Sequence, residues 1–150
     1  MSAIQAELGV SPFATISRRR IANMKYMVTI DVPLLADGIA FYEQALGFTE
    51  ESRPFPTYAV LRNGDAKIGV MEKKAGSRPA KGSDDVRRYQ RHWTPVHIDF
   101  HPDDFTRTVS DAESAGAVIE ERFEGGDHPP VAFCSDPFGN GFCIIGKREN

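Results

Sequence analysis

The sequence predicts an α+β domain built from two consecutive β-α-β-β-β modules. Two helical patterns, ending at Gly47 and Gly116, are each preceded by one β-rich run and followed by three more. The final pair of β-rich runs is joined by the turn sequence DPFGNG, residues 136–141, in which Pro fixes φ and Gly and Asn tolerate positive φ. The same order of elements therefore occurs twice along the chain.

The composition describes a soluble globular domain. The chain has 150 residues, of which 41% are hydrophobic and 26% charged, which fits one domain with a real core. The net charge is −3, and residues 1–25 are basic, so the acidic remainder makes nucleic acid an unexpected partner. No apolar run approaches the ~20 residues that span a bilayer. Two cysteines do not make a disulfide framework, and a reducing cytoplasm is the expected location.

Residues 1–25 differ from the rest and are interpreted as an N-terminal extension. They carry Arg18, Arg19 and Arg20 close together and lack the apolar stretch of a secretory signal. Two other interpretations remain open: Met24 as an alternative initiator, and an organellar transit segment.

Residues 26–75 form the first predicted module. A β-branched strand at Tyr26–Val32 ends at Pro33. A helix follows, because apolar residues recur along one face at Leu35, Ile39, Tyr42 and Leu46. Three strands come next, at Phe48–Arg53, Tyr58–Arg62 and Ala66–Glu72, with a bend at Pro54 and Pro56 and a hairpin turn at Asn63-Gly64.

Residues 76–92 read as a linker. The stretch is rich in Lys, Arg, Gly and Pro and lacks apolar periodicity, apart from one expected helical turn at Asp84–Gln90. It is either a solvated loop or, because of its basic residues, an anion-binding lid.

Residues 93–147 form the second predicted module, and residues 148–150 a tail. A strand at Pro95–Phe100 leads into a helix whose buried stripe is Phe105, Val109, Ala112 and Ala115. A strand at Val118–Phe123 and the final hairpin follow. A hairpin that turns near Phe138–Gly139 is expected to place Cys134 opposite Cys143 on one face.

Three motifs resemble those of the vicinal oxygen chelate superfamily, which includes glyoxalase I, extradiol dioxygenases, and fosfomycin- and bleomycin-resistance proteins. They are FYEQALGF at 41–48, VHIDF at 96–100 and DPFGN at 136–140. The resemblance implies a cupped mixed sheet around a cleft, the glyoxalase/bleomycin-resistance/dioxygenase fold, and a homodimer.

The resemblance also implies where metal ligands would stand. Metal-dependent members place one ligand on the first and last strand of each module, usually His, Glu, His and Glu. The matching positions here are Met27, Gly69, His97 and Cys143. Only His97 retains its type, and hard divalent ions need several N or O donors, so the usual site is expected to be absent. Strand alternation points Glu72 to the face opposite Gly69.

Other residues are candidates for a cleft. His97 is either a hydrogen-bond donor or general base in the cleft, or an ordinary histidine on a half-buried strand. A flat ligand would be sandwiched by aromatic residues, for which the candidates are Phe55, Tyr58, Trp93, Phe133 and Phe142. Some of these rings are expected only to pack in the core, and Trp93 is the best candidate for a rim contact. Asp31 and Asp99 either pair with a cationic ligand or face solvent.

The cysteines allow two interpretations. Cys134, Cys143 and His97, with Met27 nearby, offer a soft site for zinc or copper. Alternatively, the cysteines are buried and act as small hydrophobic residues.

Two functions follow. The first is a metal-free binding protein of the bleomycin-resistance kind, which needs no cofactor and holds a small amphipathic or aromatic molecule. The alternative is a lyase, isomerase or dioxygenase of the same superfamily, with His97 in a catalytic or ligand role and a divalent metal (Zn, Ni, Mn or Fe). The sequence does not name the ligand.

Overall fold

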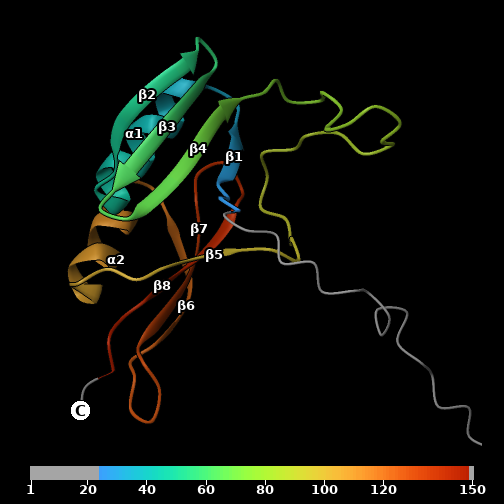
Figure 1. Cartoon of the computed structure of the whole chain (residues 1–150). Coiled ribbons are helices and arrows are strands. Elements are labelled where there is room, and N and C mark those ends of the chain that lie inside the picture. Colours follow the sequence, from blue (N-terminus) through green and yellow to red (C-terminus); the bar gives the residue numbers. More distant parts are fainter. Residues whose placement is uncertain (1–23, 149–150) are drawn as a thin grey trace, which may run out of the picture.

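The structure is a computed structural model in which residues 24–148 are described. It contains two β-α-β-β-β modules, each a four-stranded sheet with one helix (Figure 1). The α+β fold expected from the repeated pattern is therefore confirmed. The arginine cluster of the expected N-terminal extension lies outside the described residues.

The first module follows the order read from the sequence. Its elements are β1 (Val28–Val32), α1 (Leu35–Leu46), β2 (Thr49–Phe55), β3 (Tyr58–Asn63) and β4 (Ala66–Glu72). The strands lie in the order β1-β4-β3-β2. β1 runs parallel to β4, and the other neighbours are antiparallel.

The second module repeats this arrangement. Its elements are β5 (Ile98–Phe100), α2 (Phe105–Ser114), β6 (Val118–Phe123), β7 (Val131–Ser135) and β8 (Gly141–Ile145). The sheet order β5-β8-β7-β6 matches that of the first module position for position. Among the described residues, no helix is long and apolar enough to cross a membrane.

Helix α1 shows how the local sequence sets its ends. All four residues of the expected stripe are buried. Gly47 ends the helix with φ of 66°, a left-handed conformation that costs glycine little. At the start, the Glu72 carboxylate accepts a hydrogen bond from the backbone N–H of Leu35 at 2.9 Å. Glu72 therefore lies on the helix side of the sheet, as strand alternation predicts.

Three local expectations were wrong. β2 extends to Phe55 and includes Pro54, because it is an edge strand with two register shifts, where a missing N–H is tolerated. β5 begins at Ile98 rather than at Pro95. The segment 84–90 forms no helical turn, because the backbone of Arg87 pairs instead with Gly76 and Ser77.

The two modules share one core, in which helices α1 and α2 lie against each other. Phe41 of α1 makes edge-to-face contacts with Phe138 and Phe142 of the second module, with ring centroids 6.2 and 6.3 Å apart. Phe48 packs against Phe100 in the same way at 5.9 Å. Each sheet therefore has an inner face toward this core and an opposite face, here called its open face.

A buried polar contact also joins the modules. The Tyr42 hydroxyl on α1 donates to Asp136 Oδ2 at 2.8 Å, and both residues are buried. Asp136 also accepts hydrogen bonds from the backbone N–H groups of Phe138 and Asn140 and from the Asn140 side chain. Burial, and secondarily the charge of Asp136, raise the pKa of Tyr42 well above its ordinary value.

The expected pairing of the two cysteines was wrong. In the β7–β8 register Cys134 lies opposite Phe142, and Cys143 lies opposite Phe133. A difference of one residue in register places the two thiols on opposite faces of the sheet. Cys134 points into the shared core, and Cys143 lies on the open face.

Removing the Tyr42 hydroxyl should weaken the whole fold. We expect Tyr42→Phe to lower the free energy of unfolding by about 1–3 kcal/mol, because a buried acceptor on Asp136 loses a donor. Urea unfolding followed by circular dichroism measures the change. Tyr26→Phe, at a residue 92% exposed, is the matched control and should leave stability unchanged. Equal effects of the two substitutions would contradict the role given to Tyr42.

The same residue predicts a dependence on alkaline pH. Folding raises the pKa of Tyr42. The contribution of this residue to the free energy of unfolding is therefore fully present below the ordinary tyrosine pKa of about 10. It is lost as the pH rises further, since the unfolded chain gives up the phenolic proton and the folded chain retains it. We expect wild-type stability to fall more steeply above about pH 10 than that of Tyr42→Phe. Parallel stability–pH curves would refute this.

Candidate functional site

Three potential metal donors meet on the open face of the second sheet. Asp99 on β5 and Cys143 on β8 are paired directly in the parallel register. His97 precedes Asp99 by two residues, so strand alternation places it on the same face. His97 Nε2 lies 3.1 Å from Asp99 Oδ1, and one donor atom from each of the three residues lies within 4.8 Å of the others. We call this group the β5–β8 donor cluster.

The cysteines are not poised as nucleophiles. Burial, followed by the charge and hydrogen bond of Asp99, raises the pKa of Cys143 to about 11. Burial raises the pKa of Cys134 to about 12. Both thiols are therefore protonated near neutral pH, and nucleophilic chemistry, which needs a lowered thiol pKa, is disfavoured in the free protein.

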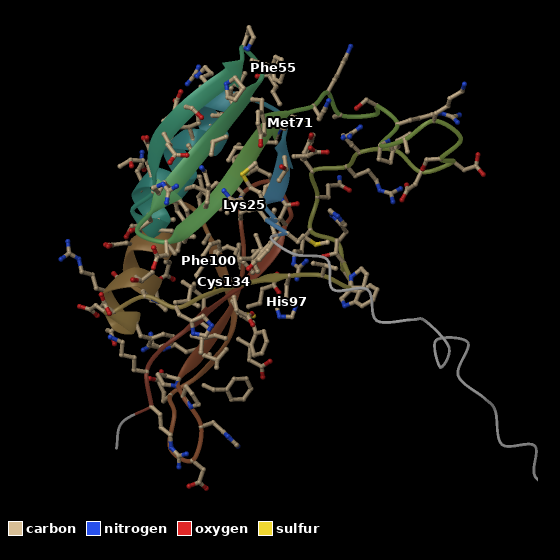
Figure 2. All side chains as sticks on the ribbon, in the orientation of Figure 1. Lys25, Phe55, Met71, His97, Phe100 and Cys134 are labelled. Carbon is tan, nitrogen blue, oxygen red and sulfur yellow. The ribbon has the colours of Figure 1, made fainter. Side chains whose placement is uncertain are left out.

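A small cavity borders His97 and Cys143 of the donor cluster. It has a volume of about 220 Å³ and is lined by Trp93, His97, Phe133 and Cys143, among others. An ion pair between Arg91 and Glu120 borders it. Trp93 is 79% exposed and Phe133 is 40% exposed, so the aromatic walls of this open-face pocket remain accessible. Figure 2 shows His97 at the outer edge of the second module.

The open face of the first sheet lacks matching donors. Gly69 has no side chain, and a Cβ there would lie 2.6 Å from the Tyr58 hydroxyl and 2.7 Å from Thr29 Oγ1. The Tyr58 side chain therefore occupies the space that a ligand at position 69 would use. Met27, just before β1, offers only a thioether. The four positions implied by the superfamily do not fit a site for a hard divalent ion, which prefers oxygen ligands.

A larger cavity lies where the two modules and the connecting segment (residues 73–97) meet; we call it the inter-module cleft. Its volume is about 430 Å³. Its walls come from β1 at Val28–Asp31, from the connecting segment, and from the neighbouring parts of β5 and β8. Figure 1 shows the connecting segment leaving β4, extending away from the sheets and returning past β1 to β5.

One contact with the first module, and others within the connecting segment, hold that segment in place. Arg87 Nε donates to Asp31 Oδ2 at 2.6 Å, and Arg87 Nη1 donates to the Arg78 carbonyl at 2.7 Å. The Tyr89 hydroxyl donates to the Lys73 carbonyl at 2.6 Å. Burial, and secondarily the charge of Asp31, raise the pKa of Tyr89. The segment is thus anchored rather than a freely solvated loop.

Contacts with the second module anchor the other end of the segment. Gln90 lies against Gly139, whose φ of 87° and lack of a Cβ permit this close approach. Arg91 forms its ion pair with Glu120 on β6. Because Arg87 is paired with Asp31, Arg88 with Asp85 and Arg91 with Glu120, these arginines are neutralised in the structure described.

The sequence candidates are distributed unevenly over these cavities. Trp93 and Phe133 line the open-face pocket, and His97 and Phe142 line both it and the inter-module cleft. Phe142 is otherwise buried among the core rings. Phe55 and Tyr58 line neither cavity. Phe55 lies at the tip of the first sheet, away from His97 (Figure 2).

Sequence reasoning missed two features of the site. Asp99 is predicted either to pair with a cationic ligand or to face solvent, although the spacing His-x-Asp in an expected strand already places both side chains on one face. Arg87 and Tyr89 were not singled out, since the connecting segment has no periodic pattern and their contacts are with distant residues.

Comparisons with known proteins agree with the duplicated fold. A family model described as a glyoxalase-like domain matches residues 27–145. No curated protein sequence matches the chain. FosX, the genomically encoded fosfomycin resistance protein of Listeria monocytogenes, has a similar structure, with a TM-score of 0.62 at 14% identity, covering 83% of this chain and 93% of FosX.

Two further structures are similar. A glyoxalase/bleomycin resistance protein/dioxygenase family enzyme from Burkholderia phytofirmans is 26% identical, with a TM-score of 0.60 over 80% of this chain and 95% of the other. Lactoylglutathione lyase from Agrobacterium tumefaciens gives a TM-score of 0.56 at 13% identity, over 83% and 95% of the two chains. The family match spans most of the chain, and this protein therefore belongs to the glyoxalase-like domain family, within the vicinal oxygen chelate superfamily.

Proposed function

We propose that this protein binds a small amphipathic or aromatic molecule in the inter-module cleft. The observation that carries the proposal is the cleft itself. Its volume of about 430 Å³ lies within the roughly 300–1,000 Å³ typical of small-molecule sites. Its walls combine apolar side chains such as Val28 and Ile98 with a few polar groups, as such sites require.

The polar groups of the cleft suggest the shape of its ligand. Asp31 and Arg87 form an ion pair in its wall, and His97 and Asn140 are also among the lining residues. A flat apolar body with one polar or charged end would bury its body against the strands. Its polar end would compete for Asp31 or Arg87, because both groups already make charge-assisted hydrogen bonds there.

A homodimer is the proposed form of the protein. Large apolar side chains remain exposed on and beside the sheets, among them Met27, Trp93, Phe123 and Phe133. A second copy that covers them would remove this surface from water. The resemblance to the superfamily supports the same assembly.

A metal-dependent lyase, isomerase or dioxygenase is the alternative function. The β5–β8 donor cluster favours it, and a structure of the similar FosX protein holds Mn(II). The cluster also gives His97 a place in a cavity, where it could donate a hydrogen bond or accept a proton. The missing donors at Met27 and Gly69 disfavour a Mn(II) site.

Ligand binding in the cleft is tested by thermal shift. We expect at least one member of a panel of planar, amphipathic molecules with a cationic or anionic end to raise the melting temperature. Free ligand at 100 times Kd stabilises the fold by about 2.7 kcal/mol, a shift of about 5–10 °C for a chain of this size. Thr29→Trp fills the exposed sheet surface at the cleft and should abolish the shift. Thr49→Trp, on edge strand β2, is the matched control and should retain it. No shift with any compound would count against the proposal.

The alternative function, a metal-dependent enzyme, is tested with hard metal ions. We expect purified protein to bind no stoichiometric Mn²⁺ or Fe²⁺, since only one oxygen ligand is available in the donor cluster. Elemental analysis after exposure to each ion under reducing conditions measures the content. One equivalent of Mn²⁺ or Fe²⁺, lost in His97→Ala, would favour the enzyme over the binding protein.

A further inference from the structure

We propose that the ligand of the inter-module cleft is an organic anion, and that Arg87 of the connecting segment binds its negatively charged oxygens. The inference rests on the proposed function, because it names the charge class of the molecule that the cleft would hold. It also bears on the basic residues of the connecting segment, for which the sequence leaves a solvated loop and an anion-binding lid as alternatives.

The guanidinium of Arg87 is held in place by three acceptors. Its Nε donates to Asp31 Oδ2 at 2.6 Å, and its Nη1 donates to the Arg78 carbonyl at 2.7 Å and to Ser77 Oγ at 3.3 Å. The Arg87 backbone is fixed as well, since its N–H donates to the Ser77 carbonyl and its carbonyl accepts from the N–H of Gly76. A ligand therefore would not have to order this side chain, which lowers the entropic cost of binding.

One nitrogen of the guanidinium remains available. A guanidinium donates from all three of its nitrogens, and the contacts of Arg87 use only Nε and Nη1. Within residues 24–148, no side-chain N or O atom is both buried and without a hydrogen-bond partner, so Nη2 of Arg87 reaches solvent. Because Arg87 lines the inter-module cleft, Nη2 can donate to an anionic oxygen of a molecule bound there.

The charged groups of the cleft wall favour a negative ligand. Its acidic and basic lining residues are Asp31, Asp85, Arg87, Arg88, His92 and His97. Each of the two carboxylates already has an arginine partner. The Arg88–Asp85 pair is exposed, and exposed pairs contribute little stability, so Arg88 is free to turn toward an anion. Protonation of either histidine would add positive charge to the wall.

Asp31 gives the proposal a sign that can be measured. An anion bound to Arg87 would lie near the Asp31 carboxylate, and like charges repel. Asp31→Asn removes that charge and leaves a side-chain oxygen that can accept from Arg87 Nε. We therefore expect this substitution to strengthen the binding of an anion, whereas it would weaken the binding of a cation. Damage to the fold cannot produce a gain in affinity.

Helix α2 offers a matched control. Arg107 and Asp111 form an ion pair of the same type, with Arg107 Nε 3.6 Å from Asp111 Oδ2. Neither residue lines the inter-module cleft. Arg107→Gln and Asp111→Asn therefore change the net charge of the protein as the two test substitutions do, without changing the proposed anion site.

Calorimetric titration of the full-length protein tests the proposal. The probes have a naphthalene, indole or biphenyl body, and each body carries a carboxylate, an aminomethyl or a carboxamide group. We expect at least one carboxylate to bind about tenfold or more tightly than the amine and amide of the same body, because hydrogen bonds to charged groups are the stronger ones. Arg87→Gln should remove this preference and leave the affinity for the amide unchanged. Asp31→Asn should tighten carboxylate binding, and the two control substitutions should leave it unchanged.

Each other outcome contradicts a different part of the argument. Equal or tighter binding of the amines or amides, or weaker carboxylate binding in Asp31→Asn, would overturn the anion assignment while ligand binding in the cleft stands. A preference retained in Arg87→Gln would refute the role of Arg87. Circular dichroism shows whether Arg87→Gln is folded, and if it is not, the direction of the change in Asp31→Asn decides. If no probe binds in any charge form, the proposed function fails and this inference fails with it.

Discussion

The arrangement of the second module depends on a buried carboxyl group that receives four hydrogen bonds. Asp136 binds the backbone of its own turn, the Asn140 side chain and the Tyr42 hydroxyl of the other module. The turn at residues 136–140 determines where β8 begins. It therefore also determines which residues of β8 face each side of the sheet. The position of Cys143 beside Asp99, and the packing of Gly139 against Gln90, both follow from that geometry.

Much of the fold could be predicted because its signals are local. The stripe on α1, the stop at Gly47 and the duplicated order of elements depend on neighbours in sequence, and all three agree with the structure. The faces of the two cysteines could not be obtained in this way. A hairpin register that differs by one residue reverses every side chain, and the register is fixed by the hydrogen bonds of Asp136. Its partner Tyr42 is far away in sequence, so no local pattern indicates the pair.

The candidate site also has a part that local sequence signals predict and a part that depends on contacts between distant residues. The placement of His97 next to β5 follows from its motif, and its closeness to Asp99 follows from their spacing of two residues in extended backbone. The walls of the inter-module cleft do not follow from the sequence, because the connecting segment has no regular structure of its own. Its position results from individual contacts, such as that of Arg87 with Asp31, which only the folded chain brings together.

The glycine at position 69 bears on how this protein could change during evolution. Any side chain there would collide with the Tyr58 hydroxyl, so a glutamate could occupy that place only after the tyrosine was replaced or moved. Either substitution alone would bring no benefit to metal binding, and the first could cost stability. A ligand set shared by both halves therefore requires at least two coupled changes, one at position 69 and one at Tyr58, whereas the donors of the second half lie together without them.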